Sequence, residues 1–329
     1  MQRIAGIEIG GTKLQIALGT SSGRIESLRR SQVDPARGAD GIRAWLEAEV
    51  PAFLSEAAKG GPAPCALGIG FGGPIDSQRG RVIKSHQIVG WSDFPLRQWA
   101  EERFGLPATV ANDSSAACWA EWKVGAGKGT NTFFYMNVGS GIGGGIVLDG
   151  RLLDGQGFGC GEIGHSYVPA GPPGAYDAAG KPPILESLCS GWALEERVRL
   201  AADLAGQSPL ARLSQGDPQR IRGPLIAEAA RAGDPVARAE IERTAEWLAY
   251  GLANVIALLH PQRIAVGGGI ALMGEMLFVP LRRQVLRVAF APFRDRVEIV
   301  PAALGDDMVV VGAMLLAAGG HYMIERSNH

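Results

Sequence analysis

The sequence has no long apolar run, no paired cysteines and almost no net charge. No apolar stretch in its 329 residues approaches the roughly 20 residues that a membrane-spanning helix needs. The four cysteines are scattered without a CxxC pair and are interpreted as reduced thiols. A net charge of −1 creates no field that would attract nucleic acid or an anionic membrane. Since a strand-like segment directly follows Met1 in place of a signal peptide, we expect a cytoplasmic protein with neither partner.

The sequence has instead an unusual number of glycines. They number 47 and gather in a few short turns, which indicates backbone groups used for binding and not a low-complexity chain. The apolar content of 46% and charged content of 20% are those of an ordinary globular protein. Because domains usually contain roughly 100–200 residues, this length predicts two of them.

The first glycine turn joins two predicted strands near the N-terminus. Ile4–Ile9 and the alternating segment Leu14–Leu18 flank Gly10-Gly11-Thr12-Lys13, where glycine can take a positive φ without strain. Successive backbone N–H groups in such a turn suit phosphate oxygens, and Thr12 and Lys13 add a hydroxyl and a positive charge. Taken alone, the motif fits a plain tight hairpin equally well.

A second glycine turn repeats the pattern about 130 residues later by our reading of the strand signals. Phe133–Val138 and Gly145–Leu148 are predicted strands on either side of Gly139–Gly144, and the repeat indicates duplication of a whole domain. The turn also satisfies GxGxxG, but a dinucleotide fingerprint must open a helix, and an apolar strand follows here. A GxxxxGK[ST] phosphate loop is absent.

Asp113 is the first candidate for chemistry. Asn112-Asp113 follows the predicted strand Ala108–Ala111 and precedes the predicted helix Ser114–Trp122. A carboxylate at this place can take a proton from a hydroxyl that attacks a phosphate. It can equally be a helix cap.

The remaining elements follow from periodicity and from helix start and stop signals. Predicted helices cover Ala39–Lys59, Pro95–Phe104 before Gly105, a long segment from Asp234-Pro235 to His260, and Met308–Ala318. Arg263–Val266 and Val297–Val300 are predicted strands, and the former enters Gly267-Gly268-Gly269.

In their order and number, these motifs resemble the ROK family of sugar kinases and sugar-responsive repressors, within the actin/hexokinase-like superfamily. The resemblance covers nearly the whole chain. It is carried by Gly6–Lys13, Gly72–Asp76, Asn112–Ala117, Val138–Gly145, Gly161–His165, Gly267–Ile270 and Leu304–Asp307.

The resemblance implies an α/β fold of two actin-like (ribonuclease H-like) domains with a cleft between them. Residues 1–113 with the returning helix in 308–329 would form the smaller domain, and residues 114–307 the larger one. A homodimer is also expected from the family.

Site roles are carried over to the matching positions. Asp113 is expected to be the general base. The expected sugar-binding residues are Gly73, Asn112, Asp113, Glu162, His165 and Glu186. The expected ATP-binding residues are Gly10, Gly11, Thr12, Lys13, Gly139, Ser140, Gly141, Gly268 and Gly269.

The chain departs from the family at two places. Glu8 stands where Asp is more usual, near the Mg²⁺–phosphate end of the site, so magnesium is expected through a longer carboxylate. The region that binds structural zinc in many members corresponds to Gly171–Gly180, which has no cysteine. Because a structural zinc needs about four ligands, which His165 with two distant cysteines does not supply, we predict no zinc.

The expected activity is transfer of phosphate from MgATP to the terminal hydroxyl of a hexose. Glucose is the first expectation, fructose the second because of Glu8, and an N-acetylated hexosamine the third. A sugar-sensing repressor is the alternative from another class, but family repressors carry a helix-turn-helix before the glycine loop, which begins here at Gly10. A non-catalytic sugar-binding protein is a third possibility.

Overall fold

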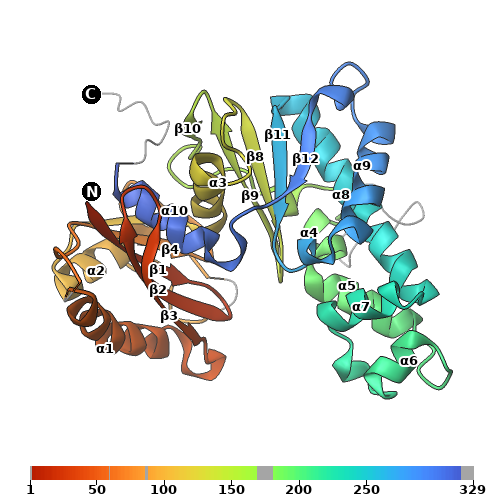
Figure 1. The fold of residues 1–329 in the computed structure, drawn as a ribbon, viewed down its shortest axis with the longest axis horizontal. Coiled ribbons are helices and arrows are strands. Elements are labelled where there is room, and N and C mark those ends of the chain that lie inside the picture. The colour runs from red at the N-terminus through yellow and green to blue at the C-terminus, as the bar shows by residue number, and fades with distance from the viewer. Residues whose placement is uncertain (1, 59, 86–87, 169–180, 320–329) are drawn as a thin grey trace. The chain divides into compact units, whose positions relative to one another are not determined.

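A computed structural model describes residues 2–58, 60–85, 88–168 and 181–319 of the protein (Figure 1). The chain divides into two compact units, each described separately below. Unit 1 comprises Met1–Asn131, Gly145–Gly161 and Ala303–His329, and unit 2 comprises Thr132–Gly144 and Glu162–Ala302. Among the described residues, no helix is long and apolar enough to cross a membrane.

The centre of unit 1 is a mixed five-stranded sheet of order β3-β2-β1-β4-β7. β1 pairs antiparallel with β2 and parallel with β4, and β7 continues the parallel half. Every residue of β1 is buried, as is typical of a strand covered on both faces. The strands are β1 (Arg3–Ile9), β2 (Lys13–Thr20), β3 (Ile25–Gln32), β4 (Leu67–Phe71) and β7 (Ala108–Asn112).

Helices and a small hairpin also belong to unit 1. They are α1 (Gly38–Ala58), β5 (Ile75–Asp76), β6 (Arg81–Val82), α2 (Leu96–Phe104), α3 (Asp113–Val124) and α10 (Met308–Ala317). A series of edge-to-face aromatic pairs runs through Phe71, Trp91, Phe94, Trp99 and Phe104. These rings add directional contacts to the apolar core between α1, α2 and the sheet.

A second five-stranded sheet has the order β10-β9-β8-β11-β12. Its strands are β8 (Phe133–Val138), β9 (Ile142–Leu148), β10 (Arg151–Leu152), β11 (Arg263–Gly267) and β12 (Glu298–Pro301). The helices of unit 2 are α4 (Leu185–Cys189), α5 (Gly191–Ala201), α6 (Pro209–Ser214), α7 (Gly223–Arg231), α8 (Pro235–Leu259) and α9 (Glu275–Val288). The predicted α/β class is therefore confirmed, because helices accompany two five-stranded mixed sheets.

Glycines let α10 lie directly on the sheet of unit 1 (Figure 1). A Cβ atom on Gly68 of β4 would overlap the carbonyl oxygen of Ala313, and one on Gly312 would overlap that of Ala116 in α3. On β1, a Cβ atom on Gly6 would also collide with side chains of α10. The absence of these side chains brings α10, α3 and two strands into backbone contact.

Most predicted elements are confirmed. Gly105 ends α2 in the left-handed conformation, and the Asp234 side chain caps α8 through the N–H groups of Val236 and Ala237. The second glycine turn is shorter than predicted: the Gly139 N–H donates to the Gly141 carbonyl, so β9 begins at Ile142 and not at Gly145. A strand does follow this turn, so the rejection of a dinucleotide fingerprint is confirmed.

Unit 1 includes α3, which follows the domain boundary expected at Asp113. The reason is a buried carboxylate. Glu121 of α3 accepts hydrogen bonds from the backbone N–H groups of Ala126, Ala303 and Leu304, at 2.8–2.9 Å. These bonds tie α3 to the segment that leads into α10. The residue ranges expected for the two domains, 1–113 with 308–329 and 114–307, remain a prediction.

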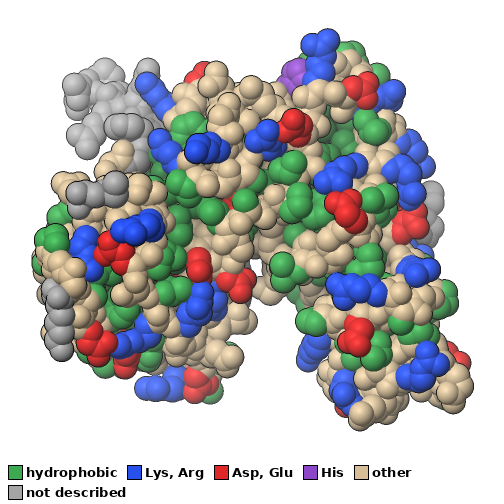
Figure 2. Space-filling model, viewed as in Figure 1, with side chains coloured by type: hydrophobic (Ala, Val, Ile, Leu, Met, Phe, Trp, Pro, Cys, Tyr) green, Lys and Arg blue, Asp and Glu red, His purple; other side chains and the backbone are tan. Residues whose placement is uncertain are grey.

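Charged side chains of both signs are interspersed on the face of the molecule seen in Figure 2. Basic side chains on that face lie among acidic ones. Ion pairs between exposed side chains of the protein include Arg283 with Glu242 and Arg287 with Glu246. Exposed pairs of this kind contribute about 0–1 kcal/mol each, so they matter more to solubility than to stability.

We predict that Gly312→Ala destabilises the protein, because the added methyl group must move either α10 or the carbonyl of Ala116. Overpacking of this kind costs about 1–3 kcal/mol or more. The matched control is Gly223→Ala at the start of α7, where a Cβ atom meets nothing within 4 Å. Urea denaturation should show a large loss for the first variant and none for the second; equal stability of Gly312→Ala and the wild type would contradict the close-packing argument.

Candidate active site

The turn between β1 and β2 is a tight hairpin. The Gly10 N–H donates to the Lys13 carbonyl over 3.0 Å. Neither Gly10 nor Gly11 has a positive φ, so the turn does not use the conformation that the sequence suggested. A Cβ atom on Gly10 would lie 3.1 Å from that carbonyl, so close approach of the backbone is what favours glycine. The Thr12 side chain is exposed beside it.

Lys13 connects this turn to the start of α10. Its Nζ lies 3.2 Å from Glu8 Oε1 and donates to the Asp306 carbonyl over 2.7 Å. The lysine side chain is one-third exposed. The ammonium group is thus held at the turn by a carboxylate and a carbonyl, while part of it faces solvent.

Glu8 is a buried carboxylate with one oxygen unused. The residue is 6% exposed, and Oε2 has no hydrogen-bond partner among the described residues. Burial raises the pKa of Glu8 to about 7, against the lowering effect of Lys13, and the charges of Asp113 and Asp307 raise it further. An orphaned acceptor of this kind suits a cation or a proton.

Asn112 is the cap of α3. Its Oδ1 accepts the N–H groups of Ser114 at 2.9 Å and Ser115 at 3.1 Å. Its Nδ2 donates to the Gly73 carbonyl over 3.1 Å, which joins the cap to the turn after β4. The capping role left open for Asp113 is therefore performed by its neighbour.

The Asp113 carboxylate lies in the first turn of α3, where the helix dipole favours negative charge. Its Oδ1 accepts the Ser114 N–H at 2.7 Å. Its Oδ2 faces Gly72: a Cβ atom on that glycine would be 3.4 Å from Oδ2 and 3.6 Å from the Cα of Gly10. The candidate base thus lies beside both glycine turns of unit 1, in electrostatic contact with Glu8.

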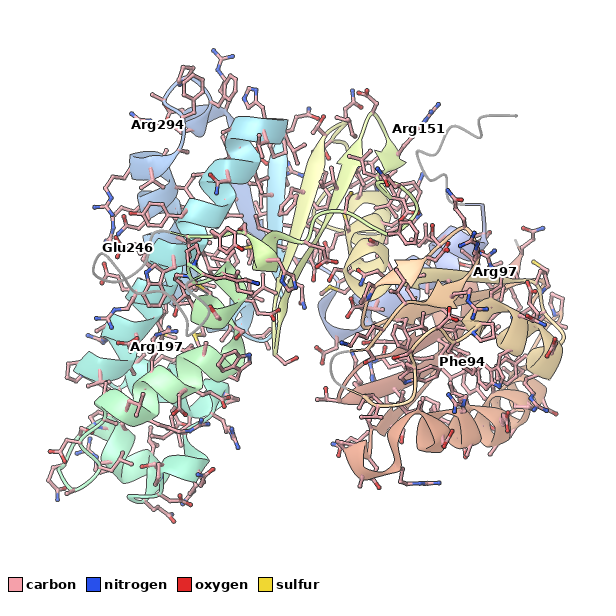
Figure 3. The ribbon with its side chains drawn as sticks, turned by 180° about the vertical axis from the view of Figure 1, so that it is seen from behind. Phe94, Arg97, Arg151, Arg197, Glu246 and Arg294 are labelled. Carbon is pink, nitrogen blue, oxygen red and sulfur yellow. The ribbon has the colours of Figure 1, made fainter. Side chains whose placement is uncertain are left out.

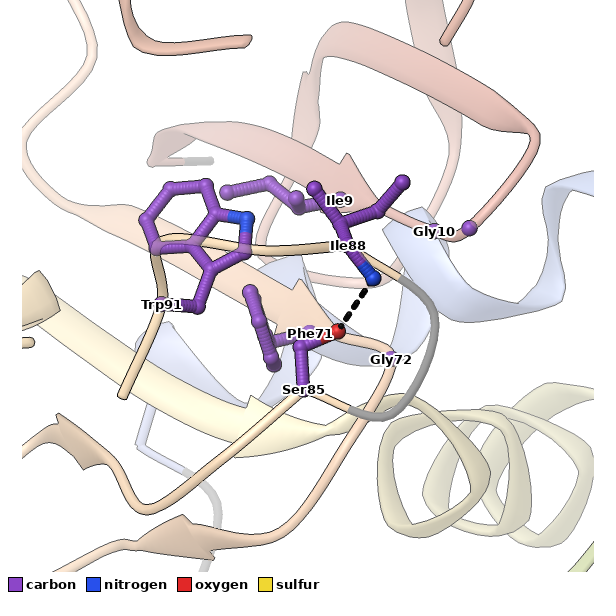
Figure 4. Close-up of a pocket in the computed structure, with 8 residues that line it drawn as sticks. Ile9, Gly10, Phe71, Gly72, Ser85, Ile88 and Trp91 are labelled. Atoms are coloured by element: carbon purple, nitrogen blue, oxygen red, sulfur yellow. Dashed lines mark hydrogen bonds between the residues drawn. The ribbon is translucent and has the colours of Figure 1, made fainter. Parts of the chain in front are cut away.

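A small hollow adjoins these turns (Figure 4). In it, Ser85 Oγ accepts the N–H of Ile88 at 3.1 Å, and the indole N–H of Trp91 is buried without an acceptor among the described residues. It is lined by Ile9, Gly10, Gly11, Phe71, Gly72, Ser85, Ile88 and Trp91. The lining is apolar apart from Ser85, the indole N–H and the backbone of the glycines.

Two glycine turns also meet in unit 2. Gly268 has a φ of +87°, and a Cβ atom there would lie 2.5 Å from the Val138 carbonyl, directly before the turn at Gly139. The Ile270 N–H donates to the same carbonyl over 3.0 Å. A Cβ atom on Gly269 would meet nothing within 4 Å, so this glycine faces open space.

The other predicted sugar residues of unit 2 lie near these turns. Glu162 and His165 are exposed at the two ends of a short 3₁₀ helix, Ile163–His165. The following Ser166 accepts the N–H of Leu185 at 2.9 Å, which brings this segment to α4. There, Glu186 is half-buried and its Oε2 accepts the Ile142 N–H at 2.7 Å.

The structure therefore collects the predicted residues in two groups. Glu8, the Gly10–Lys13 turn, Gly73, Asn112 and Asp113 gather in unit 1. Unit 2 contains Gly139, Ser140, Gly141, Glu162, His165, Glu186, Gly268 and Gly269.

Sequence reasoning missed the polar residues behind Glu8. Gln15 Nε2 and Arg30 Nη2 both donate to Asp307 Oδ1, at 3.1 Å and 2.7 Å. Asp307 ends the motif Leu304–Asp307, which carried the family resemblance without an assigned role. A polar Gln15 within the apolar strand β2 was the available signal, since Gln15 is fully buried.

No group of three or more His, Cys, Asp or Glu side chains able to hold a metal ion occurs among the described residues. The segment Gly171–Gly180, compared above with a zinc-binding stretch, lies outside those residues. The absence of zinc thus remains a prediction. Glu8 fits magnesium in another way, because Mg²⁺ is commonly bound by one or two carboxylates together with substrate phosphates.

Known proteins resemble the chain over nearly its full length. The family model described as "ROK family" matches residues 4–319. Glucokinase from Streptomyces coelicolor is 34% identical over 320 residues, covering 95% of this chain and 96% of that protein. N-acetylmannosamine kinase from Shigella flexneri is 30% identical, covering 96% and 98%. A ROK family glucokinase from Streptomyces griseus, solved with glucose and AMPPNP, has a TM-score of 0.81 and 34% identity, covering 97% and 100%.

We predict that the free energy of unfolding of the ligand-free protein falls as the pH rises from about 5 to about 7. The folded-state pKa of Glu8 is raised from 4.5 to about 7, so its contribution is fully present below pH 4.5 and is lost as the pH passes the folded value. The loss is on the order of 3 kcal/mol. Glu8→Gln should remove this dependence, and Glu102→Gln at an exposed site should not; parallel pH curves for wild type and Glu8→Gln would refute the assignment.

Proposed function

The chain belongs to the ROK family, and on that premise we propose that it is an ATP-dependent hexose kinase with Asp113 as the general base. The observation that carries the proposal is the position of Asp113. Asn112 performs the capping, and the Asp113 carboxylate lies beside the glycine turns at Gly10 and Gly72. A carboxylate next to a phosphate-binding turn is what phosphate transfer to a hydroxyl requires.

In the proposed reaction, Asp113 takes the proton of the terminal sugar hydroxyl as its oxygen attacks the γ-phosphate. In unit 1, the nucleotide's phosphate oxygens are bound by backbone N–H groups of the Gly10–Lys13 turn and by the Lys13 ammonium. From unit 2, the turns at Gly139–Gly141 and Gly268-Gly269 bind the nucleotide. These groups offset negative charge on the transferring phosphate, which is the main task in this chemistry.

Sugar recognition is assigned to six residues. In unit 1, the Asn112 amide is oriented by its two acceptor bonds and by the Gly73 carbonyl, so one N–H remains to meet a hydroxyl. In unit 2, the exposed Glu162 and His165 and the half-buried Glu186 provide further donors and acceptors. Asp113 itself is the sixth member.

Magnesium belongs to this proposal through Glu8, whose unpartnered Oε2 can accept a cation. When bound with the nucleotide, the ion would neutralise charge on the phosphate oxygens. A homodimer, carried by the family resemblance, and the cytoplasmic location expected in the sequence analysis are also parts of the proposal.

We predict that the protein releases ADP from ATP in the presence of glucose. The test is a panel of glucose, fructose, mannose and N-acetylmannosamine at equal concentrations. Glucose should give the highest kcat/KM, because the S. coelicolor and S. griseus relatives are glucokinases; N-acetylmannosamine enters through the S. flexneri relative. Absence of ADP release with every sugar would eliminate the kinase proposal.

We predict that Asp113→Asn lowers kcat by about 10²–10⁴, the usual contribution of a general base. The amide keeps an oxygen for the Ser114 N–H, so the start of α3 should be preserved. AMPPNP affinity, measured by calorimetry, should stay within about threefold of the wild type, since less than 1 kcal/mol is then lost. Retention of more than about a tenth of the wild-type kcat would exclude Asp113 as the base.

A further inference from the structure

One side chain in unit 2 contacts the phosphate turn and carries a predicted sugar role as well. Glu186 Oε2 accepts the Ile142 N–H at 2.7 Å, where β9 leaves the Gly139–Gly141 turn. A Cβ atom on Gly141 would lie 2.7 Å from the same oxygen. Gly141 does not have a positive φ, so a side chain there would meet the Glu186 carboxylate without straining the backbone conformation.

The turn is also held at its other end. The Gly191 N–H, at the start of α5, donates to the Gly139 carbonyl over 2.7 Å. Inside the turn, the Gly139 N–H donates to the Gly141 carbonyl over 2.9 Å. Bonds from α4 and α5 therefore fix both ends of a turn that has no side chain at its first and third positions.

The helix that carries Glu186 is itself anchored. Arg197 of α5 donates to the Leu188 carbonyl at the end of α4, to Glu240 Oε2 at 2.7 Å and to Thr244 Oγ1 at 2.6 Å on α8 (Figure 3). Glu240 is 4% exposed and Thr244 is fully buried. A charge network of this kind restricts α4, so the position of the Glu186 carboxylate is defined by packing on α8.

We propose that Glu186 is a positioning residue for the nucleotide: its carboxylate holds the Gly139–Ile142 turn in the shape that binds phosphate. The inference rests on the proposed function, because it takes the turn as the phosphate site. A charge-assisted hydrogen bond to a backbone N–H contributes about 1.5–3 kcal/mol. The resemblance gave Glu186 only a sugar-binding role, whereas this bond gives it an effect on the affinity for ATP even in the absence of sugar.

The test measures AMPPNP affinity by calorimetry in magnesium buffer without sugar. Glu186→Ala should weaken binding about tenfold, because about 1.4 kcal/mol of turn orientation is lost. Glu186→Gln keeps an oxygen for the Ile142 N–H and removes the charge, so affinity should stay within about threefold of wild type or increase. A role that depended on the negative charge of the carboxylate would not be rescued by Gln in this way.

Gly141→Ala is the matched variant, because its methyl group displaces the Glu186 carboxylate while leaving it charged. It should weaken AMPPNP binding about as much as Glu186→Ala. In the Glu186→Ala background it should have little further effect, since the oxygen it displaces is gone. Thermal melting confirms that each variant is folded, and if Glu186→Ala does not fold, the affinity of Gly141→Ala decides the question.

Two results would overturn the inference alone. One is wild-type AMPPNP affinity in Glu186→Ala, and the other is an undiminished effect of Gly141→Ala in the double variant. If the wild type binds no AMPPNP and phosphorylates no hexose, the proposed function fails and the inference fails with it.

Discussion

The close approach of α10 to the sheet of unit 1 is the constraint on which its candidate site depends. Gly68 and Gly312 allow backbone contact with α10 and α3, because any side chain there would overlap a carbonyl oxygen. The start of α10 is thereby brought to Lys13, and the start of α3, with Asp113, to Gly72. Unit 1 thus places a candidate base and a candidate phosphate-binding turn together through residues that have no side chain.

This packing has an electrostatic consequence at Glu8. A carboxylate that is 6% exposed is costly, and the Lys13 ammonium at 3.2 Å offsets only part of the cost. The unused Oε2 and the raised pKa are the signs of this incomplete compensation. An incompletely compensated buried carboxylate with a raised pKa is typical of a functional site, where the missing partner arrives with the substrate. The longer Glu in place of the usual Asp is therefore compatible with a working site.

In unit 2, charged side chains hold backbone segments and helices in place. Glu186 holds the turn after β8, and Arg197 anchors α4 to α8. Glycine is favoured in the two turns for different reasons. Gly268 has a positive φ and lies against the Val138 carbonyl, whereas Gly141 leaves room for the Glu186 carboxylate. A glycine motif in a sequence does not distinguish these reasons, because each depends on an atom from a distant segment.

The sequence by itself determined the strand, glycine turn, strand pattern around Gly10 and Gly139 and the main helices, because hydrophobic periodicity and capping residues act over a few neighbours. It left Asp113 open between cap and base. Only the tertiary structure decided that Asn112 is the cap, that Glu121 joins α3 to the segment before α10, and that Glu186 reaches the turn that ends at Ile142. These contacts join residues far apart in the chain, or depend on which of two adjacent residues stands at the cap position and which in the first turn. Local sequence pattern contains neither kind of information.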